Sequence, residues 1–187
     1  MYDKETNSEW SHILGEAQAG KFKGKSLKQF PCVMTDWKTW SERHPEGSVV
    51  VLKRSARNFD TKYIGRPNNF ALGIADGKDA KAWVFSGLEM TPVVMDTWKG
   101  QPVVVLYDGK SKTARLFDCR VKKKSLTFAE KDGTIIDNET QSTWDFMTGK
   151  ALKGPMTGEQ LEAMPAIPTF TRTWQEFHPM SEMWPKR

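Results

Sequence analysis

The sequence predicts a mainly β fold, an antiparallel barrel or sandwich built from two related halves, with two short helices. The first observation is an internal repeat: residues 3–45 align with residues 137–179, without a gap, at a constant offset of 134. The second is the intervening segment, residues 49–134, in which short apolar runs alternate with glycine-containing turns. We therefore interpret residues 1–187 as a single domain in which two copies of one unit flank a strand-rich segment.

Glycine, proline and tryptophan are prominent among the residues that the two copies share, which indicates a duplicated backbone shape. Four tryptophans occupy repeat positions, and we expect all four to lie in the core. They are Trp10, Trp40, Trp144 and Trp174.

Each copy begins with the pattern Asp-x-Glu-Thr-x-Ser-x-Trp, which predicts a β-hairpin. In the second copy we expect a strand at residues 134–136, a turn at 138–141 and a returning strand at 142–144. Asp137 can accept hydrogen bonds from amides of the turn, and Thr140 can close a similar local bond. The hairpin is therefore expected to be held by polar bonds within its own turn.

A short helix is predicted near the end of each copy. The expected ranges are Asp36–Arg43 and Thr171–Phe177, with Asp36 or Thr171 as the N-cap and His-Pro as the end.

The strand-rich segment predicts a series of hairpins with short connections, so we expect its sheet to be antiparallel. The expected strands are Phe70–Ile74, Ala80–Phe85, Val93–Asp96, Val103–Tyr107, Thr113–Cys119 and Ser125–Phe128.

Charge and hydropathy exclude several classes of partner. The chain has 28 Lys and Arg against 23 Asp and Glu. Its densest basic run, Arg120 with Lys122, Lys123 and Lys124, is better interpreted as a solvated hairpin tip than as a nucleic-acid patch. No apolar run approaches the roughly 20 residues of a transmembrane helix, and the N-terminus has no signal-peptide pattern. The expected partner is a protein or a small-molecule ligand, with no nucleic acid and no transmembrane segment.

The two cysteines, Cys32 and Cys119, have no metal-ligand spacing and are not equivalent in the repeat. Two buried free thiols are the favoured interpretation, and a disulfide between them is left open.

The candidate binding residues from the pattern alone are histidines and tryptophans. His44 and His178 are repeat equivalents, so a pseudo-two-fold axis would let them share a metal. The simpler interpretation is that each caps its helix, and no metal ligand is assigned. A stacking surface for a ligand is expected among tryptophans outside the repeat positions, namely Trp37, Trp83, Trp98 and Trp184.

The order and spacing of several motifs resemble the uncharacterised bacterial family catalogued as domain of unknown function 3179. The matching stretches are residues 1–6, Ser8, Trp10, Gly15-Glu16-Ala17, Trp37 to Trp40, His44-Pro45, and Gly100-Gln101-Pro102 with its following valines. Some members are selenoproteins, and members carry a Cys-Pro-Leu-Cys-Gly-Thr motif upstream of the hairpin, which implies thiol or selenol redox chemistry and a periplasmic or secreted location. Here Asp108 and Ser111 stand where that motif would place cysteines.

The sequence thus favours a noncatalytic binding or assembly module of the bacterial envelope, because a duplicated scaffold lacks a catalytic constellation. No catalytic residue and no cofactor are assigned, and Asp108 and Ser111 join the candidate binding residues. The alternative is a redox or metal-dependent enzyme of the same family. It would act through a bound metal or through a reactive thiol at Cys32 or Cys119.

Overall fold

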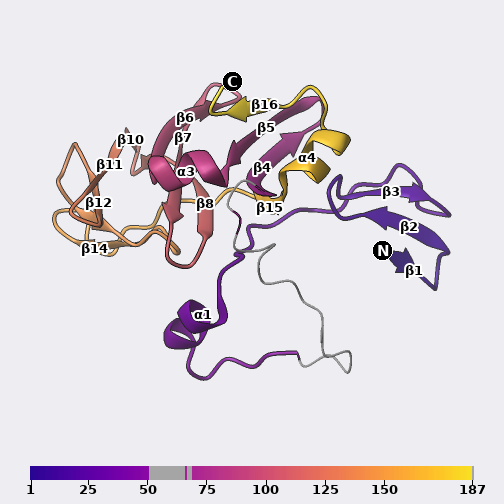
Figure 1. Cartoon of the computed structure of the whole chain (residues 1–187), viewed down its shortest axis with the longest axis horizontal. Coiled ribbons are helices and arrows are strands. Elements are labelled where there is room, and N and C mark those ends of the chain that lie inside the picture. Colours follow the sequence, from indigo (N-terminus) through magenta and orange to yellow (C-terminus); the bar gives the residue numbers. More distant parts are fainter. Residues whose placement is uncertain (51–65, 67–68, 187) are drawn as a thin grey trace.

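The computed structural model describes residues 1–50, 66 and 69–186, so part of the predicted strand-rich segment lies outside the described residues. The fold is a layered β-sandwich with three short helices and no closed barrel among these residues (Figure 1). The first large sheet has the order β15-β4-β5-β16, and the second has the order β6-β7-β8. Their strands are β4 (Phe70–Asp76), β5 (Asp79–Val84), β6 (Val93–Trp98), β7 (Gln101–Asp108), β8 (Thr113–Asp118), β15 (Ile167–Phe170) and β16 (Glu182–Trp184).

The alternation of side chains along β7 builds two cores, one on each face of its sheet. Val103, Val105 and Tyr107 pack into a cluster with residues of β4 and β5, such as Leu72. The intervening residues of β7 point to the opposite face and enter a second cluster. Successive side chains of a strand point to opposite faces, so a strand that is apolar at every position must be covered on both sides.

The second cover is the hairpin sheet of the second repeat, with the order β11-β12-β13-β14. Its Trp144 packs with Phe117 of β8 and Phe128 of β11. The strands are β11 (Phe128–Lys131), β12 (Thr134–Asp137), β13 (Thr143–Trp144) and β14 (Ala151–Lys153). The predicted hairpin of residues 134–144 is therefore present.

The first repeat forms a three-stranded sheet of its own, β1 (Tyr2–Asp3), β2 (Ser8–Ser11) and β3 (Glu16–Ala19). Its register matches that of the second repeat: Trp10 faces Ala17, as Trp144 faces Ala151, with an irregularity one residue before each tryptophan. Each copy also has an isolated bridge at the same offset, Glu16 to Ser26 and Lys150 to Gln160. The two segments therefore have the same hairpin geometry.

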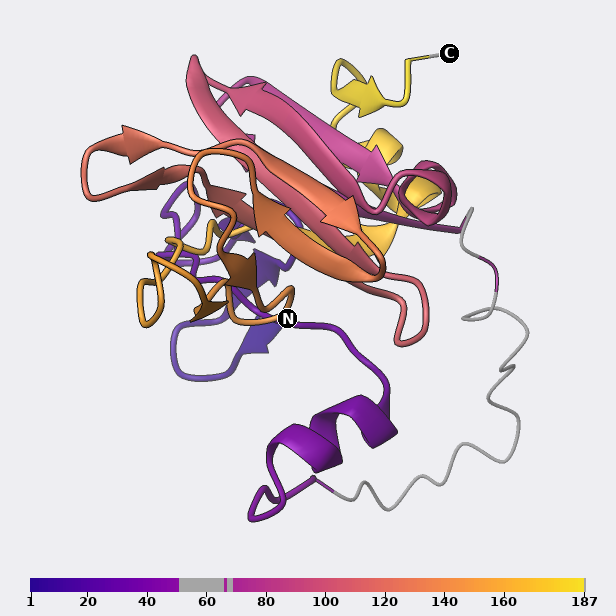
Figure 2. The ribbon, with the colours of Figure 1, turned by 90° about the vertical axis from the view of Figure 1, so that its left-hand side faces the viewer.

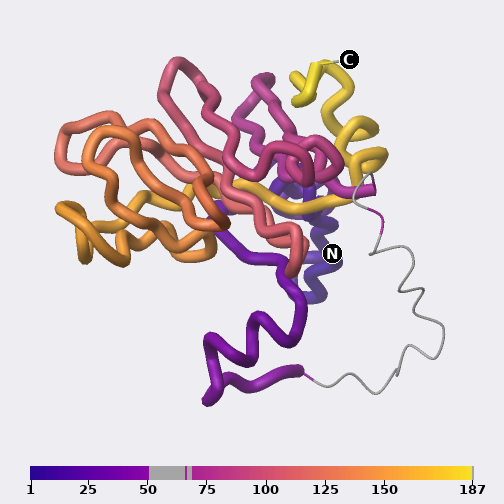
Figure 3. Tube along the Cα trace, turned by 60° about the vertical axis from the view of Figure 1, so that its left-hand side comes forward, coloured from indigo at the N-terminus to yellow at the C-terminus, as the bar shows by residue number. Residues whose placement is uncertain are grey.

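The helices are α1 (Trp37–Arg43), α3 (Phe85–Met90) and α4 (Thr171–Phe177). The side chain of Asp36 caps α1 by accepting from the amide of Thr39, at 2.7 Å. The N-cap residue of α4 is Phe170, with no side-chain cap hydrogen bond, rather than Thr171 as expected. Figures 2 and 3 show α1 projecting from the layered sheets, whereas α4 lies against β4 and β15.

Three elements differ from the expectations. The expected strand Ser125–Phe128 is interrupted, because residues 126 and 127 belong to no strand. Helix α3 follows β5 directly where only strand and turn were predicted, and its Phe85 and Leu88 are buried in the first core. Strand β16 runs parallel to β5, so the sheet that was expected to be antiparallel is mixed at one edge.

The basic run lies at a hairpin between two short strands, β9 (Arg120–Val121) and β10 (Lys124–Ser125). Lys122 and Lys123 form its two-residue turn with φ of 48° and 67°. Positive φ at both central residues is the geometry of a type I′ turn, which continues the right-handed twist of its strands. No helix in the described residues is both long and apolar enough to cross a membrane.

Candidate functional site

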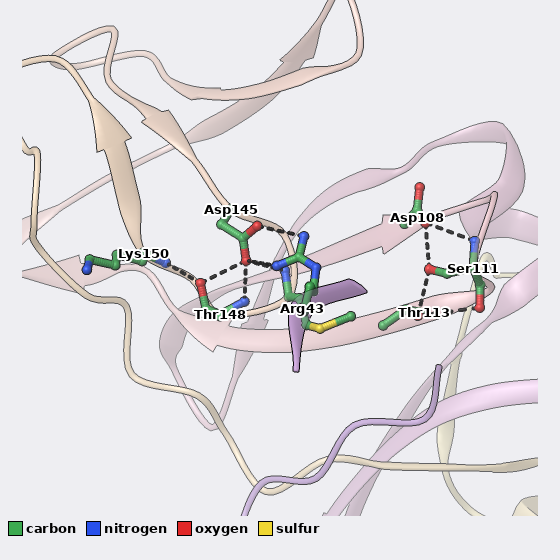
Figure 4. Close-up of polar contacts among 8 residues, drawn as sticks. Arg43, Asp108, Ser111, Thr113, Asp145, Thr148 and Lys150 are labelled. Atoms are coloured by element: carbon green, nitrogen blue, oxygen red, sulfur yellow. Dashed lines mark hydrogen bonds and ion pairs between the residues drawn. The ribbon is translucent and has the colours of Figure 1, made fainter. Parts of the chain in front are cut away.

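Asp108, Ser111 and Thr113 form one hydrogen-bonded cluster at the turn that joins β7 to β8 (Figure 4). The amide and hydroxyl of Ser111 both donate to Asp108 Oδ2, at 2.9 and 2.5 Å. The Ser111 and Thr113 hydroxyls are 2.8 Å apart, and Thr113 Oγ1 donates to Thr35 at 2.7 Å. The two candidate residues are therefore adjacent, and the turn itself engages their polar atoms.

The same cluster occurs at the opening turn of both repeats, where aspartate, threonine and serine have the same spacing. Thr140 Oγ1 donates to Asp137, and its hydroxyl lies 2.7 Å from that of Ser142. In the first repeat Asp3, Thr6 and Ser8 have the corresponding bonds. We name this arrangement the hairpin staple, and the residues are Asp3/Thr6/Ser8, Asp108/Ser111/Thr113 and Asp137/Thr140/Ser142. Asp108 and Ser111 therefore have the same kind of contacts within their turn as the aspartates and hydroxyl residues of the two repeats.

Next to the Asp108/Ser111/Thr113 staple lies a partly buried group of Glu89, Tyr107 and Lys112. Tyr107 donates to Glu89 Oε1 at 2.8 Å, and Lys112 forms an ion pair with the same carboxylate. Burial, reinforced by the negative charge of Glu89, raises the pKa of Tyr107 well above its ordinary value. Tyr107 is therefore a neutral hydrogen-bond donor at physiological pH, and the group ties α3 to the β7–β8 turn.

His44 and His178 each end their own helix. The backbone N–H of His44 donates to Trp40 O at 2.9 Å, and that of His178 donates to Trp174 O at 2.8 Å. Each imidazole also stacks on the same tryptophan, with ring centroids 4.1 and 4.2 Å apart. Burial lowers the pKa of His178.

The structure does not bring the two histidines together, because α1 and α4 lie apart in Figure 1. Within the described part of the chain, no group of three His, Cys, Asp or Glu side chains could hold a metal ion. The geometry of both histidines is that of helix caps.

The tryptophans separate into buried and exposed sets in a way that differs from the expectation. Trp83 is fully buried and donates from Nε1 to Asp96 Oδ2 at 2.9 Å, and Trp98 is also in the core. Trp83 therefore has no exposed face for stacking a ligand, whereas Trp98 lines a cavity of about 420 Å³. Trp37 is 57% exposed on α1, as a surface residue would be.

Among the repeat tryptophans, Trp144 and Trp174 are core residues as expected. Trp10 is only half-buried, and Trp40 is 36% exposed, so the expectation was wrong for Trp40. The first copy of the repeat is therefore the more open one.

The ion pair between Arg43 and Asp145 was not expected from the sequence (Figure 4). Arg43 donates from two guanidinium nitrogens to the two carboxylate oxygens at 3.1 and 2.9 Å, and it lies 5.1 Å from the Phe146 ring centroid. Burial alone would raise the pKa of Asp145, but Arg43 and the bonds from Thr148 hold it below its ordinary value. The pair joins the end of α1 to the hairpin sheet of the second repeat.

A crosswise counterpart exists for this ion pair. Phe177 is the repeat equivalent of Arg43, and Ser11 is the equivalent of Asp145. Phe177 and Ser11 line one cavity of about 640 Å³, together with Trp10. Each helix end therefore lies beside the hairpin sheet of the other repeat. The sequence contained a signal for these contacts, because the two copies have different residues at both pairs of equivalent positions. The signal could be interpreted only once the fold was known.

Both cysteines are free thiols, which agrees with the favoured interpretation. Cys119 is buried, and burial raises its pKa to about 12, so its thiol stays protonated. Cys32 is exposed, which corrects the expectation that both thiols are buried. Its carbonyl accepts a hydrogen bond from Arg115 at 2.5 Å.

Fold and site together define a layered β-sandwich protein with a recurrent hairpin staple and one exposed tryptophan-bearing helix. The chain belongs to the family described as "Protein of unknown function (DUF3179)", whose model matches residues 1–181. No curated protein and no solved structure matches the chain.

Proposed function

We propose that the chain is a noncatalytic binding or assembly module and that it binds through the face of α1 carrying Trp37 and Trp40. The observation that carries this proposal is the contrast between the two equivalent helices. Helix α1 has no buried residue and exposes both tryptophans, whereas α4 buries its Trp174 completely. Exposed tryptophans that lie close together are typical of binding surfaces, since each brings a large apolar area at low entropic cost.

The contacts of the other candidate residues support a noncatalytic role. Asp108 and Ser111 belong to a hairpin staple that recurs at two further turns, and the histidines stack on tryptophans at helix ends. A protein is favoured over a small molecule as the partner, because α1 is a projecting surface rather than a pocket. The location in the bacterial envelope is an expectation from the family resemblance.

The test is affinity capture with the purified full chain from an envelope extract of the bacterium that encodes it. We expect at least one protein to be retained by the native chain and to lose about tenfold or more in retention with Trp37→Ala/Trp40→Ala. Met180→Ala is the matched control, because Met180 is an exposed apolar residue outside α1. Equal retention by all three proteins would contradict the proposal.

The alternative enzyme is tested with the same preparations. Stoichiometric metal in the native chain that is lost in His44→Ala/His178→Ala would favour it. A thiol reaction that is abolished by Cys32→Ser would favour it as well, since Cys32 is the exposed thiol.

A further inference from the structure

The two repeats place the same helix in two different environments. Five residues are identical and equivalent in α1 and α4 or directly after them: Thr39, Trp40, Glu42, His44 and Pro45 match Thr173, Trp174, Glu176, His178 and Pro179. Both helices end with the same backbone bond and the same stacked histidine. The difference lies in what covers the tryptophan.

A part of the β4–β5 sheet that has only small side chains covers Trp174. A Cβ built on Gly73 would lie 2.4 Å from the six-membered ring of Trp174, so the indole rests directly on the glycine backbone. Ala71 of β4 and Ala82 of β5 complete the contact. The cover is therefore an antiparallel strand pair with small residues where the indole lies.

The tryptophan of the second hairpin sheet has its own cover, strand β11. This strand pairs with β12, with Glu130 opposite Ile135, and its Phe128 meets Trp144 edge-on at 5.6 Å. In the first repeat, β1 has only β2 as a strand neighbour among the described residues. Trp10 is half-buried and lines the cavity of about 640 Å³.

Both covers belong to one continuous stretch of chain, residues 70–131. We propose that the first repeat is a docking surface for a partner protein that contains a segment of the same build as residues 70–131. Such a partner would place a glycine-bearing strand pair over Trp40. It would also add an antiparallel strand to β1 and bring an aromatic side chain against Trp10. This inference rests on the proposed function and specifies its partner.

A second copy of this chain does not meet the requirement, because its own residues 70–131 are already covered. Trp174 occupies the Gly73 patch, and the edge of β11 that carries Phe128 is paired with β12. The partner segment is therefore not residues 70–131 of a second copy, and its small-residue strand pair must be open.

The experiment supplies such a segment to the intact chain. A second copy of residues 69–134 is placed directly before Met1, because Met1 is the repeat equivalent of Ile135 and the native spacing is thereby kept. Trp40 oxidation by hydroxyl radicals and amide exchange in α1 are compared with those of the native chain. We expect both rates to fall by about tenfold or more in the extended chain.

Gly73→Val in the added copy alone should restore the native rates, because its side chain would collide with Trp40 as a Cβ would with Trp174. Lys78→Ala in the added copy is the matched control and should leave the protection intact, since Lys78 is in an exposed turn.

Several results would overturn the inference. One such result is that Trp40 is already protected in the native chain. In a monomeric protein this would mean that the chain itself covers α1, and in a dimeric protein that a second copy covers it. An extension that leaves Trp40 open also overturns it, and so does one that stays unfolded, because docking should fold the added segment as it folds the existing one.

The proposed function and the inference can fail separately. Retention of a protein that depends on Trp37 and Trp40, together with an open Trp40 in the extended chain, would leave a binding module with a partner of another build. If Trp40 is protected in the extended chain but no protein is retained from the extract, the surface is complementary to the added segment and the proposed function is wrong.

Discussion

Trp40 and Trp174 have the same local sequence and opposite environments, with 36% and 0% of their surfaces exposed. Sequence reasoning expected both in the core, because large aromatic residues at repeat positions usually pack there. Burial is decided by the partner surface, which here is the glycine patch around Gly73 in one copy only. A single residue type in one motif therefore cannot reveal whether its side chain is covered.

We predict that Trp174→Ala lowers the free energy of unfolding by about 3–5 kcal/mol, since it empties a fully buried site. Trp40→Ala should lower it by about 1 kcal/mol or less, since its ring is already partly solvated. Urea unfolding of both variants, monitored by circular dichroism, measures the difference. A cost at Trp40 that equals the cost at Trp174 would contradict the exposed position of α1.

The Asp137 carboxylate leads to a prediction of how the stability of the protein changes in acid. Burial alone would raise its pKa, but hydrogen bonds from Trp144, Thr140 and Ser142 hold the pKa below its ordinary value. Its contribution to stability is therefore complete above the unfolded pKa and is lost as the pH falls through the lower folded pKa.

We predict that the unfolding free energy falls between about pH 5 and pH 2, and that Asp137→Asn makes this fall shallower. The same variant should lose about 1–3 kcal/mol at pH 7, because its buried partners lose a charged acceptor. Asp3→Asn is the matched control in the more exposed staple and should have the smaller effect. Denaturant titrations across this pH range measure the unfolding free energy. If it falls equally steeply with decreasing pH in Asp137→Asn and in the native chain, Asp137 is not the group responsible.

At the scale of elements, much of the fold is predictable because its signals are local. Helix α1 follows from its Asp36 cap, and the hairpin of residues 134–144 follows from its turn residues. Helix α3 was missed because six residues that include Gly87 and lack a capping side chain carry little helical signal. Strand β16 pairs in parallel with β5, which is distant in sequence, and no local pattern encodes such a pairing.

The candidate site was less predictable than the fold. Family resemblance directed attention to Asp108 and Ser111. The staple pattern that describes their contacts was already in the sequence as an aspartate followed by hydroxyl residues three and five positions later. Two copies of that pattern were interpreted as turns, while the third was interpreted as a degenerate cysteine motif. A direct contact of Asp108 or Ser111 with a ligand stays a prediction. The ion pair of Arg43 with Asp145 could not be predicted, because it joins residues that only the assembled layers bring together.

At the scale of the whole molecule, the two repeats contact each other crosswise. Arg43 of the first copy meets Asp145 of the second, while Phe177 of the second copy lines a cavity with Ser11 of the first. The side chain of Arg43 is 32% exposed, so the pair is a partly solvated contact. Its role is to orient α1 rather than to hold the sandwich together.

We predict that Arg43→Ala accelerates amide exchange throughout α1 while it changes the global unfolding free energy by about 1 kcal/mol or less. Hydrogen exchange with mass spectrometry separates the two effects. Lys38→Ala, on the same helix, should leave the exchange of α1 nearly unchanged. Unaltered exchange in Arg43→Ala would show that α1 is oriented by other contacts.

The parallel strand β16 also bears on the solubility of the protein. Without it, the outer edge of β5 would present unpaired backbone groups to any other extended chain, which is how sheets begin to aggregate. The strand has only three residues, and its Glu182 lies 3.4 Å from the nearly buried ammonium of Lys81. A short, charged strand thus terminates the sheet at this edge, and its detachment would expose an edge at which other extended chains could pair.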